Sequence, residues 1–142
     1  HIRTGSLSVW KAAGAGYVLS ASVAESRVYI TGSGGLTLSG AFQGNYRQVG
    51  ADKVTASAGD YILGVNVGDA ETNLRLPSAA AVGRGGIVIV KDEYPNDRTT
   101  GSAIHISASA GQTIDGASYY LLTGSMPAIH LYSNGATAWY VF

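Results

Sequence analysis

An alternation of apolar and polar residues with a period of two runs through most of the chain and limits what it can fold into. Tyr61, Leu63, Val65 and Val67, for example, occupy every second position. Successive side chains of a β-strand point to opposite faces of its sheet, so this spacing predicts half-buried strands. The one helical signal, in residues 76–86, is long enough for a single turn. The chain is therefore predicted to be all-β.

About ten short strands separated by Gly-rich turns are expected, in a sandwich-like or prism-like module of antiparallel strands. The segment "IVIV", residues 87–90, is apolar on both faces, which predicts a strand covered on one side by its own module and on the other by a neighbour. The predicted strands and strand pairs are 7–10, 17–23, 27–30, 36–38, 61–67, 74–76, 87–90, 104–108, 119–123 and 128–142.

Two local signals fix turns. Asn134-Gly135 lies between two β-prone segments and predicts a hairpin, most simply with a type I′ turn. Ser78 can cap a single helical turn formed by residues 79–82, and Gly83 can end that turn.

Charge and cysteine content exclude several classes of function. The formal net charge is zero, which gives nucleic acid or an anionic membrane no electrostatic attraction. Charged residues make up 13% of the chain, against roughly a quarter in ordinary soluble domains, which suits an oligomer or an extracellular structural protein. There is no cysteine, so thiolate metal sites and cysteine nucleophiles are excluded.

No apolar run reaches the ~18 residues of a membrane span, so membrane insertion is not expected. The chain starts with His1 rather than Met, which favours a fragment of a longer protein. A change in composition near Gly50 predicts two parts. Residues 1–50, rich in Gly, Ala and Ser, would form a β stalk or a small subdomain, and residues 51–142 would form the C-terminal β module.

The order of motifs in the last 90 or so residues resembles a β module found near the C-termini of bacteriophage tail fibres and tailspikes. These motifs are "LPSA" at 76–79, "VKD" at 90–92, "IDG" at 114–116 and "SNG" at 133–135 followed by an aromatic strand. The resemblance implies a homotrimer at the tip of a virion fibre, which serves assembly, attachment to a host-surface glycan or other receptor, or both. The first 50 residues match no family pattern.

The acidic residues Asp92, Glu93, Asp97 and Asp115 concentrate in residues 85–116. A glycosidase needs two carboxylates about 5 to 10 Å apart, and Asp92 with Asp115 could form such a pair. However, Asp115 falls in a turn tripeptide, and residues 91–93 more plausibly end a buried strand and return the chain to water. Asp92, Glu93, Asn96 and Asp97 could offer oxygens to calcium, but a calcium loop's Gly and terminal Glu are missing. No catalytic residue, metal or cofactor is predicted.

The histidines of "IHI" and "IHL", His105 and His130, are predicted to face away from their aliphatic neighbours. A solvent-facing position is favoured for both, with a three-fold ring of imidazoles on a trimer axis as the alternative. No Gly-x-Ser-x-Gly elbow is present, and "GSGG" at 32–35 precedes a strand rather than a helix.

Carbohydrate binding would need aromatic rings and planar polar groups on loops held by a rigid sheet. We expect Tyr94 to be exposed in the longest polar loop and Trp139 to lie in the core. The candidate ligand-binding residues are Tyr94, Asn96, Asp97, Arg98, Tyr119 and Tyr132.

Three classes of function remain open at this point: a viral attachment module that recognises a glycan, a purely structural trimerisation cap, and part of a capsule-degrading tailspike whose catalytic residues lie elsewhere. The chain itself is not predicted to be an enzyme.

Overall fold

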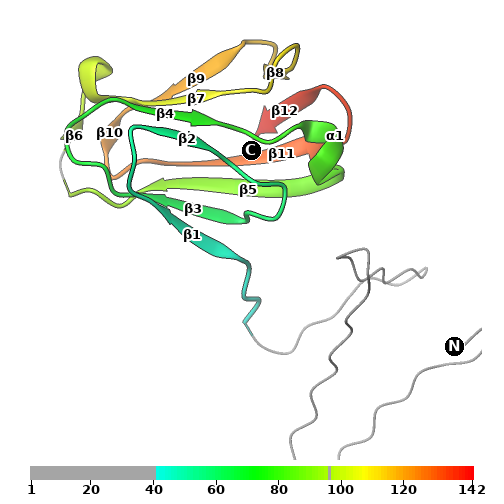
Figure 1. Ribbon diagram of the computed structural model, residues 1–142, viewed down its shortest axis with the longest axis horizontal. Helices are drawn as coiled ribbons and strands as arrows, with labels where there is room; N and C mark the ends of the chain where they lie inside the picture. The colour runs from blue at the N-terminus through cyan, green and yellow to red at the C-terminus, as the bar shows by residue number, and fades with distance from the viewer. Residues whose placement is uncertain (1–40, 96) are drawn as a thin grey trace, which may run out of the picture. The chain divides into compact units, whose positions relative to one another are not determined.

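A computed structural model of the protein describes residues 41–95 and 97–142. A compact unit spans Phe42–Phe142, and its regular structure consists of β-strands with a four-residue α-helix and one short 3-10 helix (Figure 1). The all-β prediction is confirmed for this part. The strands predicted at 7–10, 17–23, 27–30 and 36–38, and the candidate residue Asn96, lie outside the described residues.

The larger sheet has six strands in the order β1-β3-β5-β11-β12-β8. The pairs β5–β11 and β11–β12 are antiparallel, whereas β1–β3, β3–β5 and β12–β8 are parallel. Its strands are β1 (Tyr46–Val49), β3 (Ile62–Val65), β5 (Arg84–Asp92), β8 (Thr113–Ile114), β11 (Ala128–Asn134) and β12 (Ala138–Val141).

A second sheet has four strands in the order β2-β4-β7-β9, with β7–β9 antiparallel and the other pairs parallel. A small ribbon joins β6 (Asp97–Arg98) to β10 (Gly124–Ser125). The strands of the second sheet are β2 (Lys53–Thr55), β4 (Thr72–Arg75), β7 (Ile104–Ser107) and β9 (Tyr119–Leu122).

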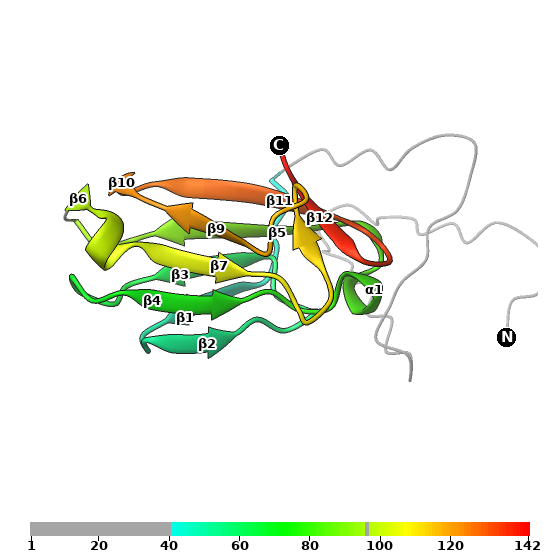
Figure 2. The ribbon, with the colours of Figure 1, turned by 90° about the horizontal axis from the view of Figure 1, so that it is seen from above.

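The prediction of antiparallel pairing throughout is wrong. From β1 to β5 the chain alternates between the two sheets: β1, β3 and β5 belong to the six-stranded sheet, and β2 and β4 to the four-stranded sheet (Figures 1 and 2). Each return to a sheet is made in the same direction as the strand before it in that sheet. The neighbours β1–β3, β3–β5 and β2–β4 therefore run parallel. A period of two identifies a strand's buried face but not its partner, which is why the sequence did not show this arrangement.

Both sheets contribute to one hydrophobic core. Val88 and Val90 of β5 are fully buried, whereas Ile87 and Ile89 are half-buried on the opposite face of the strand. Of the cover predicted for both faces of "IVIV", the described residues supply the cover of one face. The other core strand residues are Val49, Leu63, Val65, Leu74, Ile104, Ile106, Ile114, Leu122, Ile129, Leu131 and Trp139.

The predicted helical turn is confirmed as α1 (Ala79–Val82), with Ser78 at its start and Gly83, at φ 89°, at its end. Ser78 does not cap through its side chain. The amide of Gln112 acts instead: its Oε1 accepts a hydrogen bond from the Ala79 N–H at 3.0 Å, and its Nε2 donates to the Ser78 Oγ at 3.1 Å. A cap supplied from 33 residues away leaves no local sequence signal.

The hairpin of β11 and β12 is confirmed, but its type I′ turn is wrong. The last strand pair is Ser133 with Trp139, and only Gly135 of the Asn-Gly dipeptide has a positive φ, whereas a type I′ turn needs two. The Asn134 Oδ1 accepts hydrogen bonds from the N–H groups of residues 136, 137 and 138 at 2.8 to 3.1 Å. This side chain organises a longer loop.

Strand β1 precedes the boundary predicted at Gly50, yet it pairs with β3 and belongs to the β module. A salt bridge joins its Arg47 to the buried Asp60, with Nη2 and Oδ2 2.6 Å apart, and the Ser57 N–H donates to the same oxygen. Burial by itself raises the pKa of Asp60, but the hydrogen bonds from Arg47 and Ser57 and the Arg47 charge outweigh it. The net effect lowers the pKa below its ordinary value of 3.8.

Asn134→Ala is expected to destabilise the module by about 1 to 2 kcal/mol, because three backbone N–H groups lose one shared acceptor. Asn134→Asp keeps an oxygen in the same place and should lose much less. Urea denaturation of both variants measures the difference. Equal stability of Asn134→Ala and the parent protein would contradict this account of the loop.

The Arg47–Asp60 pair should make stability depend on acid pH. Because the folded pKa of Asp60 is depressed, its contribution is present above its unfolded pKa, about 4, and is lost as the pH falls through the folded value. Asp60→Asn should therefore lower stability at neutral pH and flatten its decline below about pH 4. Urea midpoints of both proteins between pH 2.5 and 6 test this, and parallel pH profiles would refute it.

Candidate functional site

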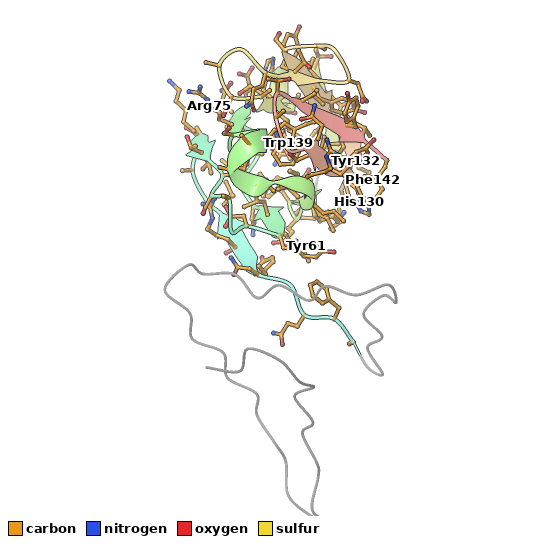
Figure 3. The ribbon with its side chains drawn as sticks, turned by 90° about the vertical axis from the view of Figure 1, so that its right-hand side faces the viewer. Tyr61, Arg75, His130, Tyr132, Trp139 and Phe142 are labelled. Atoms are coloured by element: carbon orange, nitrogen blue, oxygen red, sulfur yellow. The ribbon has the colours of Figure 1, made fainter. Side chains whose placement is uncertain are left out.

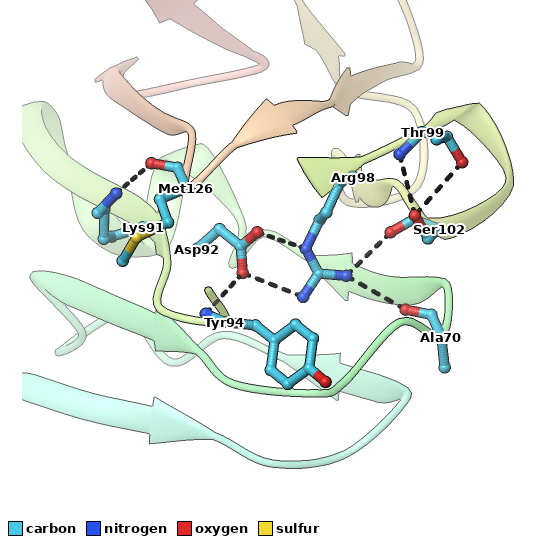
Figure 4. A network of polar contacts seen from close by, with 8 residues as sticks. All are labelled: Ala70, Lys91, Asp92, Tyr94, Arg98, Thr99, Ser102 and Met126. Carbon is cyan, nitrogen blue, oxygen red and sulfur yellow. Dashed lines mark hydrogen bonds and ion pairs between the residues drawn. The ribbon is translucent and has the colours of Figure 1, made fainter. Parts of the chain in front are cut away.

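The acidic segment is organised around a buried ion pair between Asp92, the last residue of β5, and Arg98 of β6 (Figure 4). The guanidinium binds the carboxylate through two bonds, Nε to Oδ2 at 2.6 Å and Nη2 to Oδ1 at 3.0 Å. Its Nη1 donates to the carbonyl oxygens of Ala70 at 3.2 Å and Ser102 at 2.9 Å. The Tyr94 N–H donates to the Asp92 Oδ1. The charge of each partner is thus matched and hydrogen-bonded.

Two predictions about this segment are corrected. Asp92 does not return the chain to water, since it is fully buried on the same face of β5 as Val88 and Val90. Arg98 is 4% exposed, so its guanidinium is not available to a ligand. Sequence inspection placed it in a polar loop because a lone Arg is normally solvated; the partner that makes its burial tolerable lies six residues earlier.

The geometry argues against a carboxylate pair formed by Asp92 and Asp115. Both oxygens of Asp92 already accept hydrogen bonds from Arg98. Asp115 is exposed in a turn, with a φ of 47°, and its Oδ1 accepts a hydrogen bond from the Val141 N–H at 3.3 Å. Its predicted role as a turn residue that accepts a backbone hydrogen bond is confirmed.

The structure does not bring the candidate ligand-binding residues together. Asp97 is exposed and pairs with Ser125 in the β6–β10 ribbon, and Tyr94, predicted to be exposed, is half-buried. Tyr119 lies on β9 of the four-stranded sheet, whereas Tyr132 lies on β11 of the six-stranded sheet. Trp139 is fully buried, as predicted.

The turn that follows β6 is fixed by hydrogen bonds within it and to the buried ion pair. The 3-10 helix η1 (Thr100–Ser102) follows β6, and Thr99 and Ser102 form a capping box in which the Thr99 N–H donates to the Ser102 Oγ at 3.0 Å (Figure 4). Because Ser102 also accepts from Arg98 through its backbone carbonyl, the turn is fixed to the buried ion pair.

The six-stranded sheet exposes a surface that we call the aromatic face. Except for Phe142, which follows β12, its residues alternate with buried core residues along β1, β3, β5, β11 and β12 and therefore point away from the core. The aromatic face consists of Tyr46, Ile62, Ile87, Ile89, His130, Tyr132, Tyr140 and Phe142.

Strand register aligns these side chains in two rows. One row runs Tyr46, Ile62, Ile89 and His130 across four strands. The other runs Ile87, Tyr132 and Tyr140. Phe142 lies beside His130, because its N–H donates to the His130 carbonyl oxygen at 3.1 Å.

Ring contacts join His130, Phe142, Tyr132 and Tyr140 of this face (Figure 3). The centroids of Tyr132 and Tyr140 are 5.3 Å apart, and Phe142 meets both Tyr132 and His130 edge to face, at 5.8 and 5.7 Å. Phe142 is 60% exposed and Tyr132 39%. Together these side chains form a contiguous, exposed, largely apolar patch of the kind that marks interaction sites.

At the β1 edge of the aromatic face, a hydrogen bond connects Tyr46 to Glu93. The Tyr46 hydroxyl donates to the Glu93 Oε2 at 2.8 Å, and the Glu93 carboxylate lies over Gly64, where a Cβ would collide with it. The hydrogen bond to Glu93, with smaller effects of burial and of the Glu93 charge, raises the pKa of Tyr46 above its ordinary 10.0. Tyr46 therefore stays uncharged and its ring can be part of an apolar surface.

The outer face of the four-stranded sheet, which we call the polar face, has a different character. His105 is half-buried and stacks on the Tyr119 ring with the centroids 4.4 Å apart. The predicted outward orientation of His105 and His130 is confirmed, whereas an imidazole ring on a trimer axis stays a prediction. The polar face consists of Lys53, Thr55, Asn73, Arg75, His105, Ser107, Tyr119 and Leu121.

Tyr132 is the one residue of the aromatic face that the sequence predicted as a ligand contact. The available signal was the alternation of His130 and Tyr132 with Ile129 and Leu131, which marks a strand whose solvent side is itself aromatic. Tyr46 of β1 and Ile62 of β3 had no such signal. Their place in the row depends on strand pairing between segments distant in sequence.

Within residues 41–95 and 97–142, no group of three or more His, Asp or Glu side chains is placed to hold a metal ion. In the same part of the chain no helix has the length and apolar character needed to span a membrane. Neither a family model nor a curated protein sequence matches the chain. The resemblance to phage fibre modules is carried by the motifs of the sequence alone.

Asp92→Asn should destabilise the module by about 3 to 5 kcal/mol, because it leaves the buried Arg98 charge without a counter-ion. Asp97→Asn, at an exposed position five residues on, is the matched control and should change stability by no more than about 0.5 kcal/mol. Urea denaturation measures both, and equal effects would show that the ion pair is not what holds this end of the module.

Proposed function

We propose that this chain is the distal β module of a bacteriophage tail fibre or tailspike, that it works as a homotrimer in the virion, and that it attaches the fibre to a glycan on the host surface. The observation that carries this proposal is the aromatic face. Four of its rings, those of His130, Tyr132, Tyr140 and Phe142, are joined by a chain of ring contacts. Ile87 and Ile89 lie beside them, and the other sheet of the chain has a polar outer surface.

An apolar sheet face of this extent favours contact with another protein surface. Ile89 and Tyr132 would be buried by the same face, or an adjacent one, of a second copy, and a third copy would close the ring. Three copies are preferred over two because of the resemblance to fibre modules. Such an assembly would supply the second cover predicted for residues 87–90 and would shield the apolar surface outside a cell.

The proposed module is sandwich-like. The six-stranded and four-stranded sheets share one core, with their outer faces on opposite sides (Figure 1), which supports a sandwich-like module. Assembly through the aromatic face leaves the polar face free to contact a receptor. No catalysis is proposed, since Asp92 is fully engaged by Arg98.

A purely structural trimerisation cap is the second candidate. One observation favours it: Arg98, the cation expected to address a ligand from the loop, is buried in an ion pair and serves the fold instead. Binding of the assembled protein to host cells or to their isolated surface polysaccharide separates the two candidates, because a cap would assemble normally and bind neither.

The oligomeric state tests the proposal. Sedimentation equilibrium of the full chain at micromolar concentration should give about three times the chain mass of 14.6 kDa. Tyr132→Ser combined with Tyr140→Ser should weaken assembly by roughly a hundredfold or more, since burial of each aromatic side chain contributes about 1.5 to 3 kcal/mol. A well-folded monomer of the parent protein would overturn the trimer and with it most of the fibre proposal.

Tyr119→Ser, on the polar face, is the matched control and should leave the assembly unchanged. Ile89→Asp is a second probe, because Ile89 lies on the aromatic face, whereas Val88→Asp would disrupt the core and would not report on assembly. Circular dichroism of each variant separates loss of assembly from loss of folding.

A further inference from the structure

We infer that the polar face binds an acidic glycan, with Arg75 holding a sugar carboxylate and Tyr119 stacking on a sugar ring. This inference rests on the proposed attachment function, whose ligand class it names. Charge complementarity carries it: the face offers unpaired cations beside an exposed aromatic ring.

Arg75 is the last residue of β4 and is exposed, and its side chain points away from the core (Figure 3). Its cross-strand neighbours are Thr55 and Ser107, which carry hydroxyl groups. In the described part of the chain the ion pairs are Arg47–Asp60 and Arg98–Asp92, so neither Arg75 nor Lys53 has a carboxylate partner there. The planar fork of a free guanidinium matches a carboxylate through two parallel hydrogen bonds.

An aromatic ring lies in the same row of the sheet. Ser107 pairs with Arg75 on one side and with Tyr119 on the other, so Arg75 and Tyr119 are separated by two strand spacings, roughly 10 Å. This leaves room for a sugar unit between the guanidinium and the phenol ring. Tyr119 is 49% exposed, and its ring stacks on the ring of His105 on the same face.

The acids closest in sequence to this face lie at the other end of its strands. Glu71 precedes β4 and accepts a hydrogen bond from the Asn73 side chain at 3.1 Å, and Asp52 precedes β2. Because β2 and β4 run parallel, both acids are at the end opposite to Thr55 and Arg75. The row of Thr55, Arg75, Ser107 and Tyr119 contains a cation and no acid. Asp115 precedes β9 at this end of the sheet, and its Oδ1 already accepts a hydrogen bond from the Val141 N–H.

The aromatic face is a poorer match for an acidic ligand. Its nearest strand cation, Lys91, already donates to the Met126 carbonyl oxygen, and Glu93 at its edge would repel a carboxylate. The two outer faces thus differ in the chemistry of the partner they suit, and the polar face is the one that suits an anion.

Binding to immobilised bacterial surface polysaccharides tests the inference. The probes are acidic polysaccharides rich in uronic acid, the same polymers after chemical reduction of their carboxyl groups to alcohols, and neutral polysaccharides. The assembled parent protein should bind at least one acidic polymer and lose that binding on carboxyl reduction. Arg75→Ala should weaken binding by roughly ten- to a hundredfold, as expected for lost hydrogen bonds to a charged group.

Two variants sharpen the result. Arg75→Lys keeps the positive charge but lacks the planar guanidinium that makes two parallel hydrogen bonds. Its affinity for the acidic polysaccharide should therefore lie between those of the parent protein and Arg75→Ala. Arg84→Ala removes the same type of exposed side chain from β5 of the other sheet and should bind like the parent protein.

The outcomes separate the inference from the function on which it rests. Binding that survives carboxyl reduction, that favours neutral polysaccharides, or that Arg84→Ala weakens as much as Arg75→Ala overturns the acidic-glycan inference and leaves attachment intact. A correctly assembled protein that binds neither polysaccharides nor host cells overturns both and supports the structural cap.

Discussion

The buried ion pair of Asp92 and Arg98 holds the two sheets together at one end of the module. Asp92 ends β5 of the six-stranded sheet, while the carbonyls that Arg98 also contacts belong to Ala70, just before β4, and Ser102, just before β7. One guanidinium therefore connects the larger sheet to the two central strands of the smaller one. A well-packed apolar replacement could be as stable, but it would not give these four segments a single geometry.

The sequence predicted the elements of this fold well and their partners poorly. Alternation located β3 and β7 because burial of one face is recorded residue by residue. Parallel pairing, the Gln112 cap of α1 and the register that brings Tyr46 beside Ile62 are set by contacts between segments distant in sequence. A single sequence contains no local signal for such contacts.

The same limit explains the errors in the candidate site. Arg98 and Asp97 are neighbours in a polar loop, yet one is buried and the other exposed, because only Arg98 has a carboxylate and two carbonyls within reach. Tyr119 and Tyr132 were grouped by their order along the chain, and the alternation of strands between sheets places them on different sheets. Whether a polar side chain serves the fold or a ligand depends on its partners, and hydrophobicity patterns do not identify those.

The outer faces of the two sheets differ in chemistry: the six-stranded sheet exposes aromatic side chains, and the four-stranded sheet exposes polar ones. Every second residue of a strand is committed to the core, so each sheet has only its remaining residues with which to meet its surroundings. In β11 and β12 they include His130, Tyr132 and Tyr140, with Phe142 directly after β12, whereas in β4 and β7 they are Asn73, Arg75, His105 and Ser107. The proposed assembly and receptor contact would each use one face, because outward-facing residues of either sheet can change without altering the core that the two sheets share.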